Sequence, residues 1–181
     1  MVRKINIDHV TKIEGHAKLR IKVDKGEIKK VSLNIFEGSR FFEGILKNKN
    51  FMDVNHIASR ICGICSPVHG VTSVMATEKA FNVQPSEQTV LLRELLNIGG
   101  IIQSHVVHLF FLTLPDYTGH PNAVQMAQKH PYHIKRALRL KQFSNELVRV
   151  IGGRSIHPYT VQPGGFTRIP EQDQFKKLLK S

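Results

Sequence analysis

The chain has 181 residues, of which 41% are apolar and 22% charged, a composition typical of a soluble globular domain with one substantial core. No apolar run reaches the roughly 18 residues of a membrane span. The first ten residues lack a secretory signal, so we expect a cytoplasmic protein. The formal charge is +12, but its basic residues are dispersed and no aromatic stacking motif accompanies them. Solvated faces or an acidic partner are therefore favoured over nucleic-acid binding.

The N-terminal region is predicted to be a β-hairpin. Residues 17–23 alternate apolar and basic side chains, the pattern of a half-buried strand. Lys25 and Gly26 predict a turn, after which residues 27–36 form the partner strand. Two short helices are expected next, over residues 40–47 and 53–59.

Two longer helices are predicted to follow. Ser66 as N-cap and Pro67 at the first helical position indicate a helix that runs to about residue 81. A second helix, capped by Ser86, extends through Leu112 and is apolar on most sides, so it should lie in the middle of a bundle. Its Gly99–Gly100 pair costs helix stability and predicts the close approach of a neighbouring helix.

The remainder is predicted as a loop, a long helix, an irregular segment and a short helix. The ranges are 116–121, 131–151 (ended by Gly152 and Gly153), 157–170 and 172–180. Without a repeat or a linker, residues 1–181 are interpreted as one domain, β-rich over 1–38 and mainly helical over 39–181. The predicted class is α+β: an N-terminal antiparallel β-hairpin region packed on a predominantly helical bundle.

Both cysteines of the chain lie in one CxxC, which argues against a disulfide framework and for metal binding or thiol chemistry in a reducing compartment. Cys62 and Cys65 are close enough in sequence to share one metal, and Gly63 permits a tight bend between them. A following helix N-terminus favours thiolates, and His69 lies about one turn inside that helix. Such a pair suits zinc, nickel, iron or copper.

Two other interpretations of the CxxC stay open from spacing alone. A structural zinc site would need two further ligands, and ten histidines are available. A thioredoxin-like dithiol would follow a strand, whereas helical sequence precedes this motif. His105 and His108 share one helix face, but histidines on a mostly apolar helix are typical of core residues, so both are left out of the predicted site.

The residues around the cysteines narrow these alternatives. The pattern R-x-C-G-x-C-x-x-x-H over residues 60–69 resembles the N-terminal metal-binding motif of [NiFe]-hydrogenase large subunits. Further motifs that resemble the family occur in the expected order at residues 12–16, 41–43, 104–116 and 152–158. The residues of these motifs are most similar to those of the cytosolic coenzyme-F420-reducing or NAD(P)-linked, sulfhydrogenase-like branch.

The resemblance implies a role for each matched residue. Cys62 would be a terminal nickel ligand, and Cys65 would bridge nickel to an iron that carries CO and cyanide. His69 would donate a hydrogen bond near the bridging sulfur. Glu14 would accept the proton released from H2, although a glutamate before a glycine could equally sit in a turn.

Two acidic residues complete the implied site. Glu43 would help to bind magnesium or a similar hard cation, and Asp116 would lie near the open side of the metals. Both are otherwise typical solvated acids. The implied partners are maturation proteins, a flavin-containing acceptor subunit, and the iron–sulfur small subunit.

The family requires a second cysteine pair, which this sequence lacks. We therefore expect the C-terminal half of a large subunit to be absent, and the chain to be inactive until a C-terminal remainder completes it. A truncated paralogue, or a non-enzymatic module that uses its CxxC for zinc and its basic surface to dock a partner, is the alternative. The quinone-site subunit of respiratory complex I shares the fold but lacks these cysteines.

Overall fold

The computed structural model describes residues 2–13, 15–36 and 38–180. The chain forms two compact units, Met1–Gly44 and Ile45–Ser181, which are described separately below. A single domain was expected from the sequence. The division between the units falls near the predicted border between the β-rich and the helical part.

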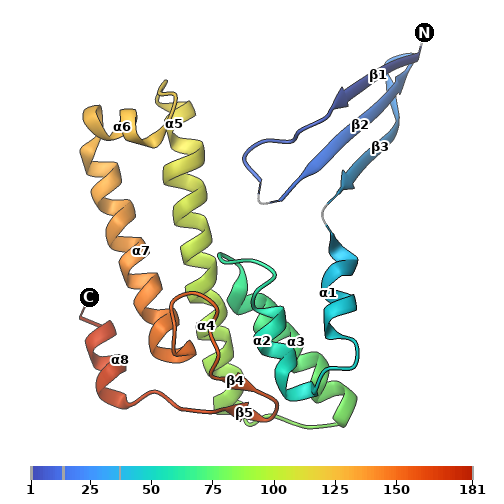
Figure 1. Cartoon of the computed structure of the whole chain (residues 1–181). Helices are drawn as coiled ribbons and strands as arrows, with labels where there is room; N and C mark the ends of the chain where they lie inside the picture. The colour runs from blue at the N-terminus through green and yellow to red at the C-terminus, as the bar shows by residue number, and fades with distance from the viewer. Residues whose placement is uncertain (1, 14, 37, 181) are drawn as a thin grey trace. The chain divides into compact units, whose positions relative to one another are not determined.

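The first unit is built on a three-stranded antiparallel sheet in the order β1 (Val2–Ile7), β2 (Ala17–Asp24) and β3 (Glu27–Ile35) (Figure 1). The predicted hairpin of β2 and β3 is confirmed. Its turn residues have left-handed backbone angles, with φ of 51° at Lys25 and 83° at Gly26, as a two-residue hairpin turn of the primed type requires. Strand β1 was not predicted, because its alternation covers only six residues.

The two faces of this sheet differ in chemistry. Because successive side chains point to opposite faces, the register gathers apolar residues on one face and basic and amide residues on the other. The apolar face is nevertheless exposed: Leu33 is 60% and Ile35 70% accessible. Among the described residues of this unit, Ala17 alone is buried. The sheet therefore has almost no core of its own.

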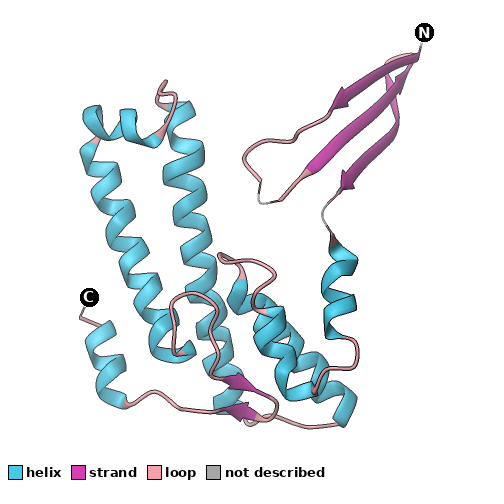
Figure 2. Cartoon of the chain, viewed as in Figure 1, coloured by secondary structure: helices cyan, strands magenta, loops and turns pink. Residues whose placement is uncertain are grey.

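Helices make up most of the second unit (Figure 2). Helix α1 (Ser39–Leu46) crosses the border between the units. The elements after it are η1 (Phe51–Asp53), α2 (Val54–Ala58), α3 (Ser66–Phe81), α4 (Glu87–Val106), η2 (Val107–Thr113), α5 (Leu114–Tyr117), α6 (Ala123–Lys129), α7 (Pro131–Gly152), β4 (Val161–Gln162), β5 (Gly165–Phe166) and α8 (Gln172–Leu178). The predicted α+β class, with helix dominant, is confirmed.

The close approach predicted at the paired glycines of α4 is confirmed. A Cβ on Gly99 would lie 2.8 Å from Cγ2 of Val148 in α7, and one on Gly100 would lie 3.0 Å from Cγ of Pro67 in α3. The distance at Gly99 is shorter than real Cβ contacts, and at Gly100 the proline would have to shift by a few tenths of an ångström, so the two glycines let the three helices pack closely. The main core of the unit, which includes Leu96 and Ile151, lies beside this contact.

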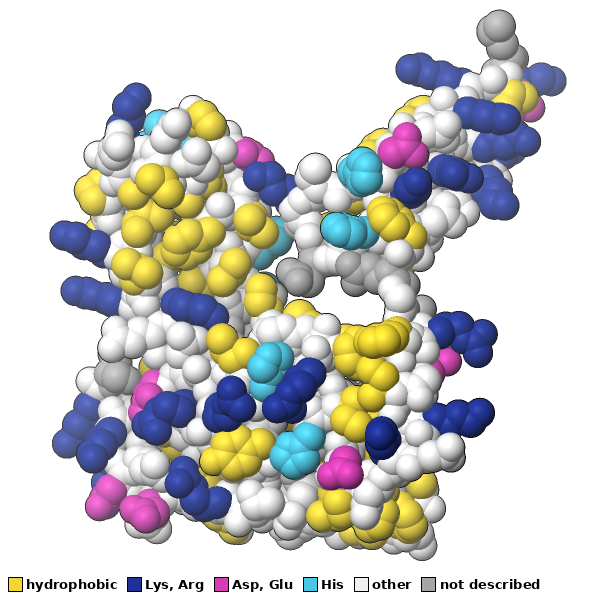
Figure 3. Space-filling view, viewed as in Figure 1, with side chains coloured by type: hydrophobic (Ala, Val, Ile, Leu, Met, Phe, Trp, Pro, Cys, Tyr) yellow, Lys and Arg dark blue, Asp and Glu magenta, His cyan; other side chains and the backbone are white. Residues whose placement is uncertain are grey.

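Helix α4 lies between α3 and α7 as expected, but it is not covered on all sides. It buries one side, whereas several of the apolar residues counted in its favour are exposed, among them Leu91 at 54% and Ile98 at 48%. Figure 3 shows apolar side chains gathered on the surface of the helical unit. A sequence pattern records which side chains avoid water, but it does not say whether the covering partner belongs to the same chain.

The same helix continues further than predicted. After Val106 it passes through the seven-residue π-helical segment η2 and into α5, so Asp116 belongs to a helix and not to the expected loop. The combined helix Glu87–Tyr117 is long and apolar enough to cross a membrane by length and composition, and about a third of its most apolar stretch is buried. Its N-terminal half carries the buried Arg93 and its middle the buried Gln103, both of which are bonded to other parts of the unit.

A buried ion pair joins α3 to α4. Arg93 donates two hydrogen bonds to the carboxylate of Glu78, at 2.8 and 2.7 Å. The backbone N–H of Gly164 donates to the same carboxylate at 2.7 Å. Burial alone would raise the pKa of Glu78, but the bonds from Arg93 and Gly164 outweigh it and hold the pKa below its ordinary value. The carboxylate therefore stays ionised and holds two helices and the β4–β5 turn together.

Candidate metal centre

The two cysteines lie in the short loop between α2 and α3. Both side chains are half-buried. The backbone N–H of Cys65 donates to Sγ of Cys62 at 3.3 Å. Cys65 is the N-cap residue of α3. The loop thus presents both sulfurs at the positive end of a sixteen-residue helix, as the sequence predicted.

Ser66 performs a different task from the one predicted. It was expected to cap α3, but Cys65 occupies that position and no side-chain cap forms. The Ser66 side chain is fully buried, and its hydroxyl donates to the carbonyl of Gly63 at 3.2 Å. The same oxygen accepts the backbone N–H of His157 at 3.1 Å. Ser66 therefore ties the middle of the cysteine loop to a segment 91 residues away.

His157 makes a second connection to the same region. Its Nδ1 lies 2.8 Å from the carbonyl oxygen of Ser59, just before the cysteine loop. Because a carbonyl only accepts, Nδ1 carries the proton of this hydrogen bond. His157 has a φ of 54°, a backbone conformation that costs free energy in a residue other than glycine. The surrounding contacts, from both its backbone and its ring, hold it there.

Close packing also fixes the direction of α3. A Cβ on Gly70 would lie 2.6 Å from Oδ1 of Asn55 in α2, and Nδ2 of Asn55 donates to the carbonyl of Val161 at 2.6 Å. Together with the contact of Pro67 and Gly100, these approaches anchor both flanks of the cysteine loop. Sequence reasoning missed Asn55, Ser59 and His157, because their bonds join residues that are distant along the chain.

Gly63 was expected to permit a sharp bend, but its backbone is not in the left-handed region. A Cβ at this position would meet nothing within 4 Å. No packing contact therefore requires glycine at this position. Two cysteine sulfurs three residues apart fit a soft or borderline metal.

Two further residues of the motif lie near the cysteines in sequence. His69 is in the first turn of α3 and half-buried, and its backbone N–H donates to the carbonyl of Cys65 at 3.2 Å. Arg60 is exposed, and its guanidinium donates to the carbonyl of His56. The predicted hydrogen bond from the His69 ring toward a bridging sulfur stays a prediction.

Of the three acidic candidates, Glu43 and Asp116 fall within the described residues. Glu43 lies in α1, where its exposed carboxylate is 3.4 Å from Nε of Arg40. Asp116 is exposed in α5, roughly four helical turns beyond Gly100, where α4 contacts the start of α3. Glu14 lies outside the described residues. In the described part of the chain, no three His, Cys, Asp or Glu side chains are grouped so that they could hold a metal ion.

Comparison with protein families agrees with this geometry. The model of the nickel-dependent hydrogenase family matches residues 40–137, which include the cysteine loop, α3 and α4. A second model, described as HoxL-like, matches residues 4–37. The chain belongs to the nickel-dependent hydrogenase family. The resemblance inferred from R-x-C-G-x-C-x-x-x-H is thereby confirmed.

Individual relatives and solved structures extend this assignment to nearly the whole chain. The alpha chain of sulfhydrogenase 2 of Pyrococcus furiosus is 41% identical over 97% of the chain and 43% of its own length. The matching chain of the F420-non-reducing hydrogenase vhu of Methanocaldococcus jannaschii is 37% identical over 98% and 44%. The crystal structure of an NAD+-reducing [NiFe]-hydrogenase in its H2-reduced state matches with a TM-score of 0.81 at 26% identity, over 98% of the chain and 41% of the solved one. The chain thus spans about two fifths of the length of its relatives.

Proposed function

We propose that this chain acts as the N-terminal part of the catalytic subunit of a hydrogenase and contributes two of the thiolates that hold a nickel–iron centre. The observation that carries the proposal is the pair of half-buried cysteines, Cys62 and Cys65, at the start of α3 in a member of a nickel-dependent family. When bound, the centre would supply the redox chemistry that splits H2 into protons and electrons. Cys62 would be the terminal nickel ligand and Cys65 the bridge to an iron with CO and cyanide.

The residues around the thiols would prepare them for that task. The N–H of Cys65 donates to Sγ of Cys62, and Ser66 and His157 hold the loop in one conformation. Metal sites depend on such outer contacts to orient their ligands. His69 would hydrogen-bond near the bridging sulfur. Glu14 would receive the proton released from H2, and Asp116 would act from the open side of the centre.

Two thiolates leave a nickel ion under-coordinated, so other groups must complete the centre. We infer that a C-terminal remainder of the large subunit supplies them, since the chain spans 43% of the Pyrococcus relative. The exposed apolar residues of α4, such as Leu91 and Ile98, fit a protein cover of this kind. This cover would also explain the apolar length of α4 without a membrane span. Glu43 would bind magnesium together with ligands from the same remainder.

We infer the other components of the assembly from the family. An iron–sulfur small subunit would take up the electrons, and a flavin-containing subunit would pass them to an F420- or NAD(P)-linked acceptor. Maturation proteins would insert the metals. We also propose a cytoplasmic location, because the chain's two cysteines fall in one CxxC and offer no disulfide framework; cell fractionation would check it.

The experiment is to produce the chain together with a C-terminal remainder, the maturation proteins and the small subunit. The purified assembly should contain nickel and iron and show infrared bands from CO and cyanide. Cys62→Ser and Cys65→Ser should each abolish nickel retention and H2 oxidation. Thr72→Ala, at an exposed position on α3, should leave both unchanged. An assembly that holds zinc in place of nickel and iron would overturn the proposal.

Zinc binding to the isolated chain tests the alternative of a zinc-binding docking module. A structural zinc site needs four ligands, and the described residues bring no third His, Cys, Asp or Glu to the cysteines. We therefore expect weak zinc binding, measured by competition with a chromogenic chelator. Tight one-to-one binding that both cysteine variants remove would favour the module instead.

A further inference from the structure

The polar face of the N-terminal sheet carries a charge arrangement that the proposed function does not use. Its register places Lys4 opposite Lys22, and Lys22 opposite Lys30, so one lysine of each strand stands in a single row. The next row on the same face consists of Asn6, Arg20 and Ser32. Figure 3 shows Lys and Arg side chains clustered over the sheet.

Such a row is unfavourable in the absence of an anion. Like charges directly opposite each other on neighbouring strands destabilise a sheet, and Lys22 faces a lysine on both sides. Lys4, Lys30 and Arg20 are exposed, and Lys22 lies between them. Asp24 and Glu27 lie one row further toward the turn, where Glu27 pairs with Lys29 at 2.5 Å. A bound anion or salt would therefore relieve the repulsion within the row.

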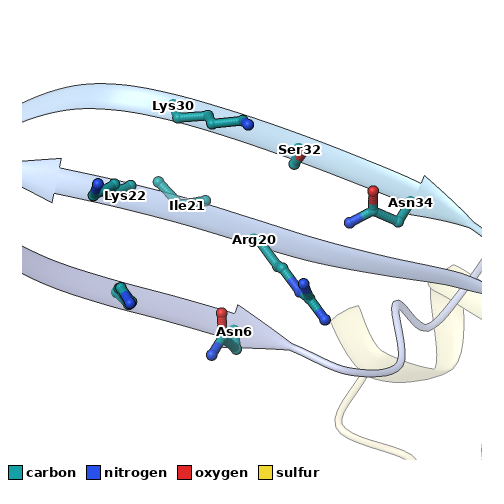
Figure 4. A pocket seen from close by; sticks show the side chains of 8 residues that line it. Asn6, Arg20, Ile21, Lys22, Lys30, Ser32 and Asn34 are labelled. Carbon is teal, nitrogen blue, oxygen red and sulfur yellow. The ribbon is translucent and has the colours of Figure 1, made fainter.

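The face is also hollowed. Residues of the two rows line a depression of about 390 Å³, which falls in the range of small-ligand sites. Figure 4 shows Lys30, Lys22 and Asn6 rising from three adjacent strands, with the guanidinium of Arg20 extending toward β1. The β-bulge between Lys22 and Val23 increases the local twist of the sheet at this point.

The spacing of the cations indicates which anion fits. Strands lie about 4.8 Å apart and alternate residues about 6.8 Å apart, so the four cations occupy an area of roughly 10 by 7 Å. An extended acidic peptide presents one side chain per roughly 6.8 Å on one face and would place about one carboxylate against each row. A chain of linked phosphates concentrates several charges within the same area and offers oxygens to the donors of Asn6 and Arg20.

The aromatic residue at the end of this face argues against nucleic acid. Single-stranded nucleic acid binds on open aromatic platforms. Phe36 is already engaged, with Nζ of Lys18 5.3 Å from its ring centre and the His16 ring stacked at 5.6 Å. Among the described residues that line the depression, none is aromatic.

We propose that the Lys4–Lys22–Lys30 row, together with Arg20, forms a binding site for inorganic polyphosphate. The site lies on the sheet unit and does not depend on the metal centre. Its occupant neutralises the lysine row and so stabilises β2 between its neighbours. Anion binding at this face would make the stability of the sheet sensitive to phosphate chains and to ionic strength.

The test is isothermal titration of the full chain with tripolyphosphate at low salt. Removal of one cation, in Lys22→Gln or Arg20→Gln, should weaken binding roughly two- to fivefold, and the double variant should weaken it further. Lys135→Gln removes the same charge from α7, in the other unit, and should leave the affinity at the wild-type value. Equal affinity in the wild type and all of these variants would overturn the proposal.

Competing ligands separate the remaining possibilities. Sulfate at equal ionic strength, hexaglutamate and an oligothymidylate should each bind more weakly than tripolyphosphate. Tighter binding of either polymer, or equal binding of sulfate, would contradict a polyphosphate site. Without ligand, the amides of β2 should exchange with solvent more slowly in Lys22→Gln than in the wild type, because the substitution removes the repulsion. Unchanged or faster exchange would contradict the repulsive row.

Discussion

The two units of the chain are stabilised in different ways. The helical unit has a core around Leu96 and Ile151, glycines at helix contacts and the buried Glu78–Arg93 pair. The sheet unit has regular strands and a well-formed turn, yet among its described residues only Ala17 is buried. Hydrogen-bonded strands alone are marginally stable in water. The helical unit should therefore carry the stability of the chain, whereas the sheet unit depends on surfaces that cover it.

The largest expected effect is the loss of the buried ion pair. Glu78→Gln leaves the guanidinium of Arg93 buried without its carboxylate and should lower the free energy of unfolding by about 3–5 kcal/mol. Urea unfolding followed by circular dichroism measures this change. Glu94→Gln, at an exposed position on the same helix as Arg93, should be nearly neutral. Equal effects of the two substitutions would show that the pair does not stabilise the helical unit.

The same pair predicts how stability responds to acid. The pKa of Glu78 is lowered in the folded chain from its ordinary value of 4.5, so its stabilising contribution is fully present above pH 4.5. It is lost as the pH falls through the lower folded value. Unfolding free energies measured from about pH 7 to about pH 3 should fall more steeply in the wild type than in Glu78→Gln. Parallel curves would contradict this assignment.

A matched pair of leucines compares the two units directly. Leu96→Ala removes a side chain that is 0% exposed and should cost about 2–5 kcal/mol. Leu33→Ala, on the exposed face of the sheet, should change the stability of the chain by less than about 0.5 kcal/mol. Denaturant unfolding of both variants measures the difference. A large cost at Leu33 would mean that the sheet face is covered within this chain.

Two glycine substitutions compare a close contact in the helical unit with an open position in the sheet unit, with smaller expected effects. Gly152→Ala would place a Cβ 2.5 Å from Cβ of Pro158, and because the proline ring cannot move aside, about 1–3 kcal/mol should be lost. Gly44→Ala in α1 meets nothing within 4 Å and should be neutral or gain up to about 1 kcal/mol from helix propensity. Thermal unfolding midpoints of the two variants should therefore move in opposite directions, or only the first should move.

The smallest effect concerns the cysteine loop. Ser66→Ala removes the hydroxyl between Gly63 and His157 and should cost about 1 kcal/mol. Ser73→Ala, whose hydroxyl bonds only one turn back to Gly70, should cost less. In an assembled hydrogenase, Ser66→Ala should also speed nickel loss to a chelator, and Ser73→Ala should not. Equal nickel loss in both variants would show that Ser66 stabilises the fold but does not help the cysteines to retain nickel.

Local rules predicted the parts of the fold that local chemistry decides. The hairpin turn, the N-cap at Ser86 and the long α7 all follow from neighbouring residues, and all are present. The short α6 was missed, although Asn122 caps it by accepting the N–H of Gln125 at 2.9 Å. Its seven residues carry too little periodicity for a helix to be recognised without that cap.

The candidate site was predicted only in part, because some of its contacts are local and others join residues that are distant along the chain. The CxxC and the helix behind it are contiguous in sequence, so their arrangement followed from spacing. The role of Ser66 did not, because a long-range bond to His157 replaced the expected local cap. The roles of Glu43 and Asp116 come from the family resemblance alone, and they stay predictions.

The hydrogen bonds of His157 bear on the order in which parts of the chain fold during synthesis. Its contacts with Ser59 and Ser66 span 98 and 91 residues, so during synthesis the cysteines leave the ribosome long before the segment that clamps them. The sulfurs reach their final arrangement only after α7 has folded back onto α4. Until then the cysteine loop lacks the two bonds that join it to His157.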